Sequence, residues 1–166
     1  MKAVTRLAKL RALDAEGWRL LAVSVVAVPL VQWRLQRTGF GAIADRLARS
    51  SDRVAIHHEP GEAEARARRA AKVVAVVANR RWIGAPCLGR SLELWWWLRR
   101  QGIDAELAIG AMAPNGEVEF AAHAWVEVEG VPVNDAADVG ERFGRFPIAL
   151  ARLRGQDGAE RQAVER

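Results

Sequence analysis

The stretch that decides the fold is HAWVEVEGVPVND, residues 123–135, in which apolar and polar residues alternate on both sides of a glycine. Alternation with a period of two is typical of a half-buried strand, and Glu129-Gly130 is typical of a tight turn. The pattern therefore predicts a β-hairpin. Successive side chains of a strand point to opposite faces of the sheet, so His123 should lie on the face opposite Ala124.

The register of this hairpin determines which residues meet across it. A three-residue loop over residues 128–130, with glycine in the last, left-handed position, places His123 directly opposite Asp135. Such residues share a face, with Cβ atoms about 5 Å apart. A two-residue loop would instead set Asp135 opposite Ala124, on the other face. We expect the three-residue loop.

Two segments before the hairpin continue the same alternation. Residues 105–109 alternate after Gly102, the sequence PNG at residues 114–116 marks a turn, and residues 118–128 alternate again. Together with the hairpin, these segments predict an antiparallel meander.

The segment before the strands begins with Pro86-Cys87 and predicts a helix over residues 87–101. Proline disfavours the α conformation in the residue before it, and Gly102 suits the C-cap. Because three consecutive residues cannot face one side of a helix, at least one indole of Trp95-Trp96-Trp97 should point away from the main core. It would then pack on the N-terminal helices or line a groove. The apolar stripe of this helix comprises Leu88, Leu92, Trp95 and Leu98.

The N-terminal part of the chain is helical in pattern. Residues 5–49 predict helices with a break near Pro29 or Thr38-Gly39, and residues 62–79 predict another helix. Helices followed by a meander indicate an α+β fold. We expect an N-terminal helical region over residues 1–55, a core domain over residues 56–155 and a polar C-terminal tail over residues 156–166.

Composition narrows the class of protein. The chain has 166 residues, a net charge of +5 and one cysteine. A single cysteine excludes an intrachain disulfide and fits the cytoplasm, and no spacing of cysteine and histidine resembles a zinc site. We expect no metal and no cofactor. The arginines are spread along the chain without interleaved aromatic residues, so we expect no nucleic-acid partner.

The most apolar stretch, residues 18–33, is short for a membrane span, which needs about 20 residues. No cleavage motif follows it, so it does not resemble a signal peptide. We expect a buried or interface helix. Basic residues flank this stretch, so peripheral contact with a membrane remains an alternative. The basic residues are Arg6, Lys9, Arg11, Arg19, Arg34 and Arg37.

Three residues carry the candidate chemistry. Cys87 would stand at a helix N-terminus, where the helix dipole favours a thiolate, and its own N–H could donate to an oxyanion. Asp135 would orient the imidazole of His123, so that the other ring nitrogen faces Cys87. The order of Cys87, His123 and Asp135 along the chain predicts a nucleophile, a general base and an orienting carboxylate, respectively.

Each of these residues also has a structural interpretation. A lone cysteine is often a small buried hydrophobe, a strand histidine is often a core residue, and an aspartate after a strand is often a turn cap. Glu127 and Asp138 are alternative carboxylates. Glu127 lies four residues along the strand from His123, and Asp138 lies beyond the predicted pairing.

The motifs around these residues resemble a known family. The segments are PCLGRSLEL at 86–94, LRRQGI at 98–103, HAWVEV at 123–128 and VND at 133–135. They are similar to the lasso-peptide leader peptidases of the transglutaminase-like superfamily, also called microcin-processing B proteins, over roughly residues 60–140. The helical N-terminus and the length resemble the stand-alone peptidase form.

The resemblance implies a transglutaminase-like, or papain-like, core in which the nucleophile helix packs on an antiparallel sheet. It implies a cysteine protease that removes the leader from a ribosomally made precursor peptide, with Cys87 as nucleophile, His123 as general base and Asp135 as orienting residue. It also implies two partners, which are a separate leader-binding protein and an ATP-dependent cyclase that closes the macrolactam.

Two other functions remain open at this stage. The same fold and triad would also serve an acyltransferase or amidase, in which an amine replaces water as the acceptor. A non-catalytic module would use the tryptophan-rich helix and the basic N-terminal region to bind a peptide partner.

Overall fold

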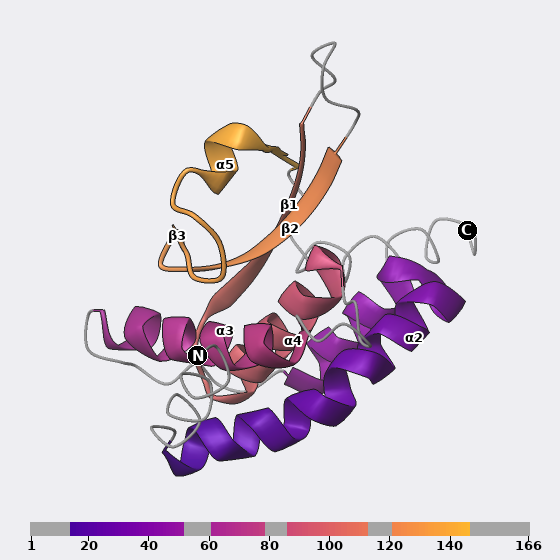
Figure 1. Cartoon of the computed structure of the whole chain (residues 1–166). Helices are drawn as coiled ribbons and strands as arrows, with labels where there is room; N and C mark the ends of the chain where they lie inside the picture. Colours follow the sequence, from indigo (N-terminus) through magenta and orange to yellow (C-terminus); the bar gives the residue numbers. More distant parts are fainter. Residues whose placement is uncertain (1–13, 52–60, 79–85, 113–120, 147–166) are drawn as a thin grey trace, which may run out of the picture.

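The computed structural model describes residues 14–51, 61–78, 86–112 and 121–146 and has the expected α+β fold. Three longer helices pack below a narrow, curled antiparallel sheet (Figure 1). The sheet has the strand order β3-β2-β1-β4. The elements are α2 (Ala15–Ser51), α3 (Glu62–Ala78), α4 (Cys87–Arg100), β1 (Ala105–Met112), β2 (Ala121–Val128), β3 (Val131–Pro132), α5 (Val139–Arg142) and β4 (Gly144–Arg145).

Helix α2 starts where the Asp14 carboxylate accepts a hydrogen bond from the Gly17 N–H at 2.8 Å. The predicted break is confirmed at Gly39, whose φ of 76° interrupts the helix, but the alternative at Pro29 is wrong. Proline removes one hydrogen bond from a helix. Burial of Val28 and Val31 on either side of Pro29 keeps this part of the helix packed despite that loss.

The main core lies between the helices and one face of the sheet. Helix α2 packs on α3 and α4, and α4 packs on β1 and β2. Each element contributes fully or nearly fully buried apolar side chains to one cluster: Leu20, Val31, Val74, Leu92, Leu98, Leu107 and Val126. The position of α4, which begins with Cys87, is therefore fixed by both the N-terminal helix and the sheet.

Helix α4 ends as its sequence predicts. Gly102 adopts a φ of 79°, and the Ile103 N–H donates to the Leu98 carbonyl, so glycine follows the helix in the left-handed position. Trp95 and Trp97 are buried, whereas Trp96 turns outward and donates from its indole N–H to the Ser50 hydroxyl of α2. The expected packing of one indole on the N-terminal helices is confirmed, although Trp96 lies at the edge of the main core and not away from it.

The two faces of β2 pack into different hydrophobic clusters. Val126 and Val128 belong to the core shared with the helices, while Trp125 belongs to a second, smaller cluster with Val139 and Phe143. Strands β1 and β2 pair antiparallel from Ala105↔Val128 to Met112↔Ala121, which confirms this part of the meander. The turn predicted at residues 114–116 lies outside the described residues.

The predicted hairpin register is wrong. Glu127 pairs with Pro132 and Val128 with Val131, so the loop consists of Glu129 and Gly130 alone. Both residues have positive φ, 53° and 76° respectively. This is the type I′ turn, whose twist matches that of the flanking strands, and it requires positive φ at both positions. Asparagine, aspartate or glycine usually occupies the first position of a type I′ turn, so the glutamate at this position did not predict that turn.

Candidate functional site

Cys87 is the first residue of α4, with a partly buried and unpaired thiol. Pro86 occupies the N-cap and has no side chain that can accept a hydrogen bond from the helix. This contrasts with α2, where Asp14 caps the helix. The N–H groups of the first turn of α4 therefore stay available beside the sulfur, where they can stabilise a thiolate or an oxyanion.

His123 and Asp135 are in direct contact, although the register that predicted it is wrong. The imidazole Nε2 lies 2.7 Å from Asp135 Oδ2. Strand β3 ends at Pro132, and Asn134 then accepts the Val126 N–H through its side-chain oxygen at 2.8 Å. This side chain takes over the position of a ladder carbonyl. The following residue is thereby released from the strand alternation and can turn toward the histidine.

Several interactions determine the charge of Asp135. Burial tends to raise the pKa of its carboxyl. The hydrogen bonds from His123 and the Ala136 N–H, together with the positive charges of His123 and Arg90, outweigh that effect and hold the pKa below its usual value. The ionised carboxylate can only accept, so it accepts a hydrogen bond from the Nε2–H group. In the neutral imidazole the lone pair then lies on Nδ1, the nitrogen that a general base uses.

The ring of His123 is held from the side away from the helices. The Phe143 ring lies 4.8 Å from it between centroids, and the fully buried Trp125 ring lies 6.3 Å away. Gly110 faces His123 across the β1–β2 ladder. A Cβ atom on Gly110 would lie 2.9 Å from the carbonyl oxygens of Phe143 and Gly144, so glycine permits this close approach.

Sequence reasoning missed both Phe143 and Gly110. A glycine inside a strand that otherwise alternates is a signal of close backbone approach, and it was present at Gly110. No comparable signal marks Phe143. It follows the four-residue helix α5 and precedes the two-residue strand β4, and such short elements have no periodicity to recognise.

A buried serine ties α4 to the histidine strand and to the aspartate segment. Ser91 lies one helical turn after Cys87, and its hydroxyl donates to the Ala124 carbonyl at 2.9 Å. The same hydroxyl accepts a hydrogen bond from the Asn134 side-chain amide at 2.9 Å. Ala124 is next to His123, and Asn134 is next to Asp135. One hydroxyl thus connects the three segments that carry the candidate residues.

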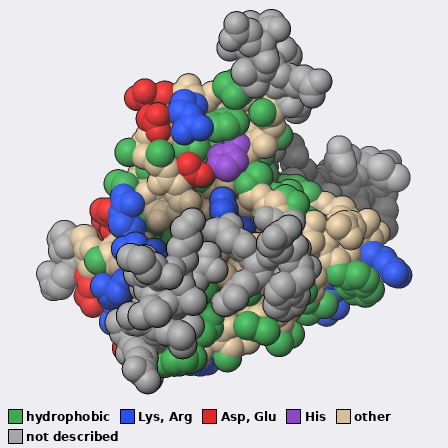
Figure 2. Space-filling model, in the orientation of Figure 1, with side chains coloured by type: hydrophobic (Ala, Val, Ile, Leu, Met, Phe, Trp, Pro, Cys, Tyr) green, Lys and Arg blue, Asp and Glu red, His purple; other side chains and the backbone are tan. Residues whose placement is uncertain are grey.

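The described structure contains no hydrogen bond between the Cys87 thiol and the His123 imidazole. The side chains of His123 and Asp135 are 19% and 21% exposed, and a histidine side chain reaches the surface in Figure 2. Catalytic hydrogen bonds of substrate-free sites often tighten when substrate binds. The arrangement is therefore an imidazole–carboxylate pair, accessible to a substrate, with its helix-start thiol still unpaired.

The alternative carboxylates have other partners. Glu127 accepts hydrogen bonds from the Trp125 indole and from Arg145, each at 2.7 Å. Asp138 is exposed and lies 3.8 Å from Arg142. Neither is needed to explain the orientation of His123. Of the three candidate carboxylates, Asp135 is the one that contacts the imidazole of His123.

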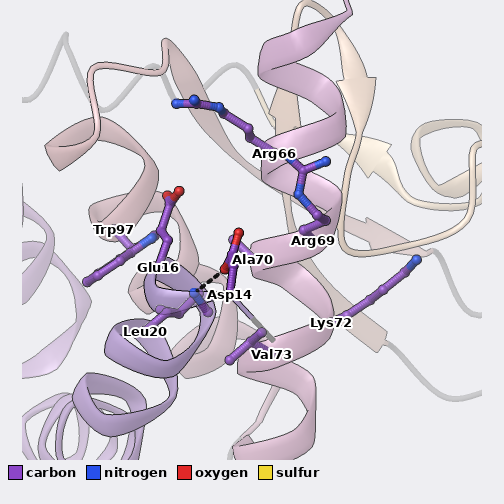
Figure 3. A pocket seen from close by; sticks show the side chains of 10 residues that line it. Asp14, Glu16, Leu20, Arg66, Arg69, Ala70, Lys72, Val73 and Trp97 are labelled. Atoms are coloured by element: carbon purple, nitrogen blue, oxygen red, sulfur yellow. Dashed lines mark hydrogen bonds between the residues drawn. The ribbon is translucent and has the colours of Figure 1, made fainter. Parts of the chain in front are cut away.

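A separate cavity of about 230 Å³ lies where the N-terminal end of α2 meets α3 and α4 (Figure 3). Charged side chains from α2 and α3 surround it, including Glu16, Arg69 and Lys72, and Trp97 closes one side. It contains none of the three candidate residues. Among the described residues, no group of three histidine, cysteine or acidic side chains is arranged to hold a metal ion.

The fold and the site define an α+β domain with a helix-start thiol and a histidine–aspartate pair on the adjoining sheet. The model of the transglutaminase-like superfamily matches residues 25–147. The chain belongs to this superfamily, which includes cysteine proteases and acyltransferases. No curated protein and no solved structure matches the chain.

Proposed function

We propose that the protein is a cysteine protease that removes the leader from a ribosomally synthesised lasso-peptide precursor. The observation that supports this proposal best is the 2.7 Å contact between His123 Nε2 and Asp135 Oδ2, because it leaves Nδ1 free to act as a base. Ser91 ties the segments of both residues to the helix that begins with Cys87. Membership of the superfamily supports acyl transfer at that cysteine. The resemblance of the motifs around these residues supports the precursor as substrate.

In the proposed first step, Nδ1 of His123 takes the thiol proton and the sulfur attacks the carbonyl carbon of the scissile peptide bond. The N–H of Cys87, which has no acceptor within its helix, donates to the developing oxyanion. The imidazolium then protonates the leaving nitrogen. The C–N bond breaks, the core peptide departs with a free N-terminus, and the leader stays on Cys87 as a thioester.

In the proposed second step, His123 takes a proton from water and the hydroxide attacks the thioester carbonyl. The C–S bond breaks, the leader leaves with a new carboxylate, and the thiol is restored. Asp135 stabilises the imidazolium in both steps and keeps its proton on Nε2. The proposed setting is the cytoplasm, with a separate leader-binding protein to present the precursor and an ATP-dependent cyclase to use the freed amine.

The direct test is cleavage of a precursor peptide in the presence of the leader-binding protein, followed by mass spectrometry. We expect Cys87→Ala and His123→Ala to abolish release of the leader, and Asp138→Asn, a matched surface change, to leave it intact. Cleavage by Cys87→Ala would contradict the proposal. A leader joined to an added amine, with no free carboxylate formed, would favour the acyltransferase reading.

A second test separates an enzyme from a binding module. Iodoacetamide can label one cysteine in this chain, so the pH dependence of labelling reports on Cys87 alone. An activated thiolate reacts well below pH 8.5, the ordinary pKa of a cysteine thiol, and the reaction should weaken in His123→Ala. A thiol that reacts only after unfolding would contradict a nucleophilic role.

A further inference from the structure

The first half of α2 exposes a continuous apolar face. Between Trp18 and Trp33 the exposed large apolar side chains are Trp18 at 50%, Val25 at 48%, Val26 at 67%, Leu30 at 45% and Trp33 at 48%, and Arg19 is exposed beside them. At 100° per residue they fall within one arc of about 140°. The stripe, which we call the α2 face, is about 22 Å long from Trp18 to Trp33. Hydrophobic side chains are visible over the α2 region in Figure 2.

Charge around the α2 face has one sign. From Gly17 to Ala44 the helix has no acidic residue, and its charged side chains in that stretch are Arg19, Arg34 and Arg37. Arg19 and Arg37 are separated by 18 residues, or five helical turns, so they lie in line, just inside the edge of the face that Leu30 forms. The Arg37 guanidinium stacks 5.0 Å from the centre of the Trp33 ring. An apolar stripe with tryptophan at both ends and arginine at its edge complements an anionic lipid surface.

The opposite side of α2 determines how it can meet a membrane. By length and composition α2 could cross a bilayer, and 22% of its most apolar window is buried in the protein. Leu20, Ser24, Val28 and Val31 are buried against the rest of the molecule. A helix that crossed the membrane would have to withdraw these side chains from the core. A helix that lies in the interface keeps them and buries the exposed face.

We propose that the α2 face binds the surface of an anionic phospholipid membrane, with the helix lying parallel to it. This inference is independent of the reaction at Cys87. Arginine side chains extend from the edge of the face to lipid phosphates, while the tryptophan rings occupy the interface between headgroups and acyl chains. The catalytic domain is thereby held at a membrane without crossing it.

The test uses the full chain and vesicles of phosphatidylcholine with about one-quarter phosphatidylglycerol, compared with phosphatidylcholine alone. We expect co-sedimentation with the anionic vesicles, a blue shift of tryptophan fluorescence, weaker binding at high salt and release by alkaline carbonate. Val26→Glu should lower partitioning about tenfold, which corresponds to loss of one buried valine side chain. Ala42→Glu, which adds the same charge to an exposed site beyond Gly39, should change it less than about twofold.

Equal circular dichroism and thermal unfolding of the two variants would show that a loss of binding is not a loss of folding. Four results would overturn the proposal: absence of binding to anionic vesicles, equal effects of Val26→Glu and Ala42→Glu, retention after alkaline carbonate, which indicates a spanning helix, and dimers that Val26→Glu disrupts in a chain that does not bind vesicles. The last result would assign the α2 face to a second copy of the chain.

Discussion

At the scale of single residues, the orientation of one imidazole depends on one carboxylate. Asp135 binds Nε2 of His123 and also accepts the Ala136 N–H, so its two oxygens are fixed from both sides. The lowered pKa of Asp135 means that the carboxylate is ionised throughout the neutral range. The stability that this ionisation contributes is present above the usual aspartate pKa and is lost as the pH falls through the lower folded-state value.

Replacing Asp135 by asparagine should therefore separate catalysis from folding. The amide N–H of asparagine can donate a hydrogen bond to an unprotonated Nε2, which stabilises the tautomer with the proton on Nδ1, so we expect kcat to fall by about 10²- to 10⁴-fold. The melting temperature at pH 7 should change by only a few degrees, because the side chain keeps its size. Cleavage kinetics and thermal unfolding measure the two effects. A kcat within about twofold of the natural chain would assign Asp135 a purely structural role.

A second residue-scale prediction concerns Glu93, a carboxyl buried between α4 and α2. Burial raises the pKa of Glu93 to about 7, and the Ser24 side chain opposes this shift only partly. Neither carboxyl oxygen has a hydrogen bond of ordinary geometry within the described structure. Between about pH 4.5 and 7 the folded state therefore retains a proton that the unfolded state has already lost.

The sign of the pH dependence follows from this difference. Below about pH 4.5 both states hold the proton; between about 4.5 and 7 the unfolded state releases it first, so the free energy of unfolding falls by about 3 kcal/mol in total. Glu93→Gln should remove this fall and raise the melting temperature at pH 8. Glu141→Gln, on the exposed surface, should not. Parallel stability curves for the two variants from pH 5 to pH 8 would contradict the assignment.

At the scale of secondary-structure elements, Ser91 fixes α4 relative to β2 and the segment after β3. Ser91→Ala leaves the Ala124 carbonyl and the Asn134 amide without their shared partner, and a loss of about 1–3 kcal/mol in stability is expected. Because the serine connects the segments that carry Cys87, His123 and Asp135, we expect kcat to fall more than KM changes.

A matched serine distinguishes position from general stability. The Ser50 hydroxyl also links two elements, because it accepts a hydrogen bond from the Trp96 indole, but it does so at the exposed contact between α2 and α4. Ser50→Ala should cost less than about 0.5 kcal/mol and leave kcat unchanged. Denaturant unfolding and precursor cleavage, measured on both variants, supply the comparison. If Ser91→Ala lowers the free energy of unfolding but leaves kcat unaltered, the hydrogen bonds of Ser91 stabilise the fold and have no part in the reaction.

The elements also show where sequence patterns suffice and where they do not. The helical stripe of α4 and the alternation of β2 predicted the Cys87 helix start and the face of His123, because burial imposes these periods. The loop length escaped prediction, since Glu129-Gly130 fits both a two-residue turn and a three-residue loop. The contact with Asp135 formed by a different route, in which the Asn134 side chain ends the ladder. No sequence pattern predicts that a side-chain oxygen will replace a backbone carbonyl in the ladder.

At the scale of the whole molecule, the N-terminal helix and the site share one core. Leu20 and Val31 of α2 belong to the same buried cluster as Leu92 of α4 and Val126 of β2. The sheet face that carries His123 is closed by the smaller cluster around Trp125 and Phe143. Loss of α2 would expose the side of α4 that packs on it. The candidate site should therefore unfold in the same transition as the whole domain.

Leu20→Ala tests this coupling. Removing a fully buried leucine leaves a cavity and should lower the free energy of unfolding by about 2–5 kcal/mol. We expect helix loss, measured by circular dichroism, and reactivity of the single thiol of Cys87 to share one denaturant midpoint, shifted equally in the variant. Leu30→Ala, in the exposed face of the same helix, should shift neither by more than about 0.5 kcal/mol. Helix loss at a lower midpoint than thiol exposure would show instead that α2 unfolds independently of the site.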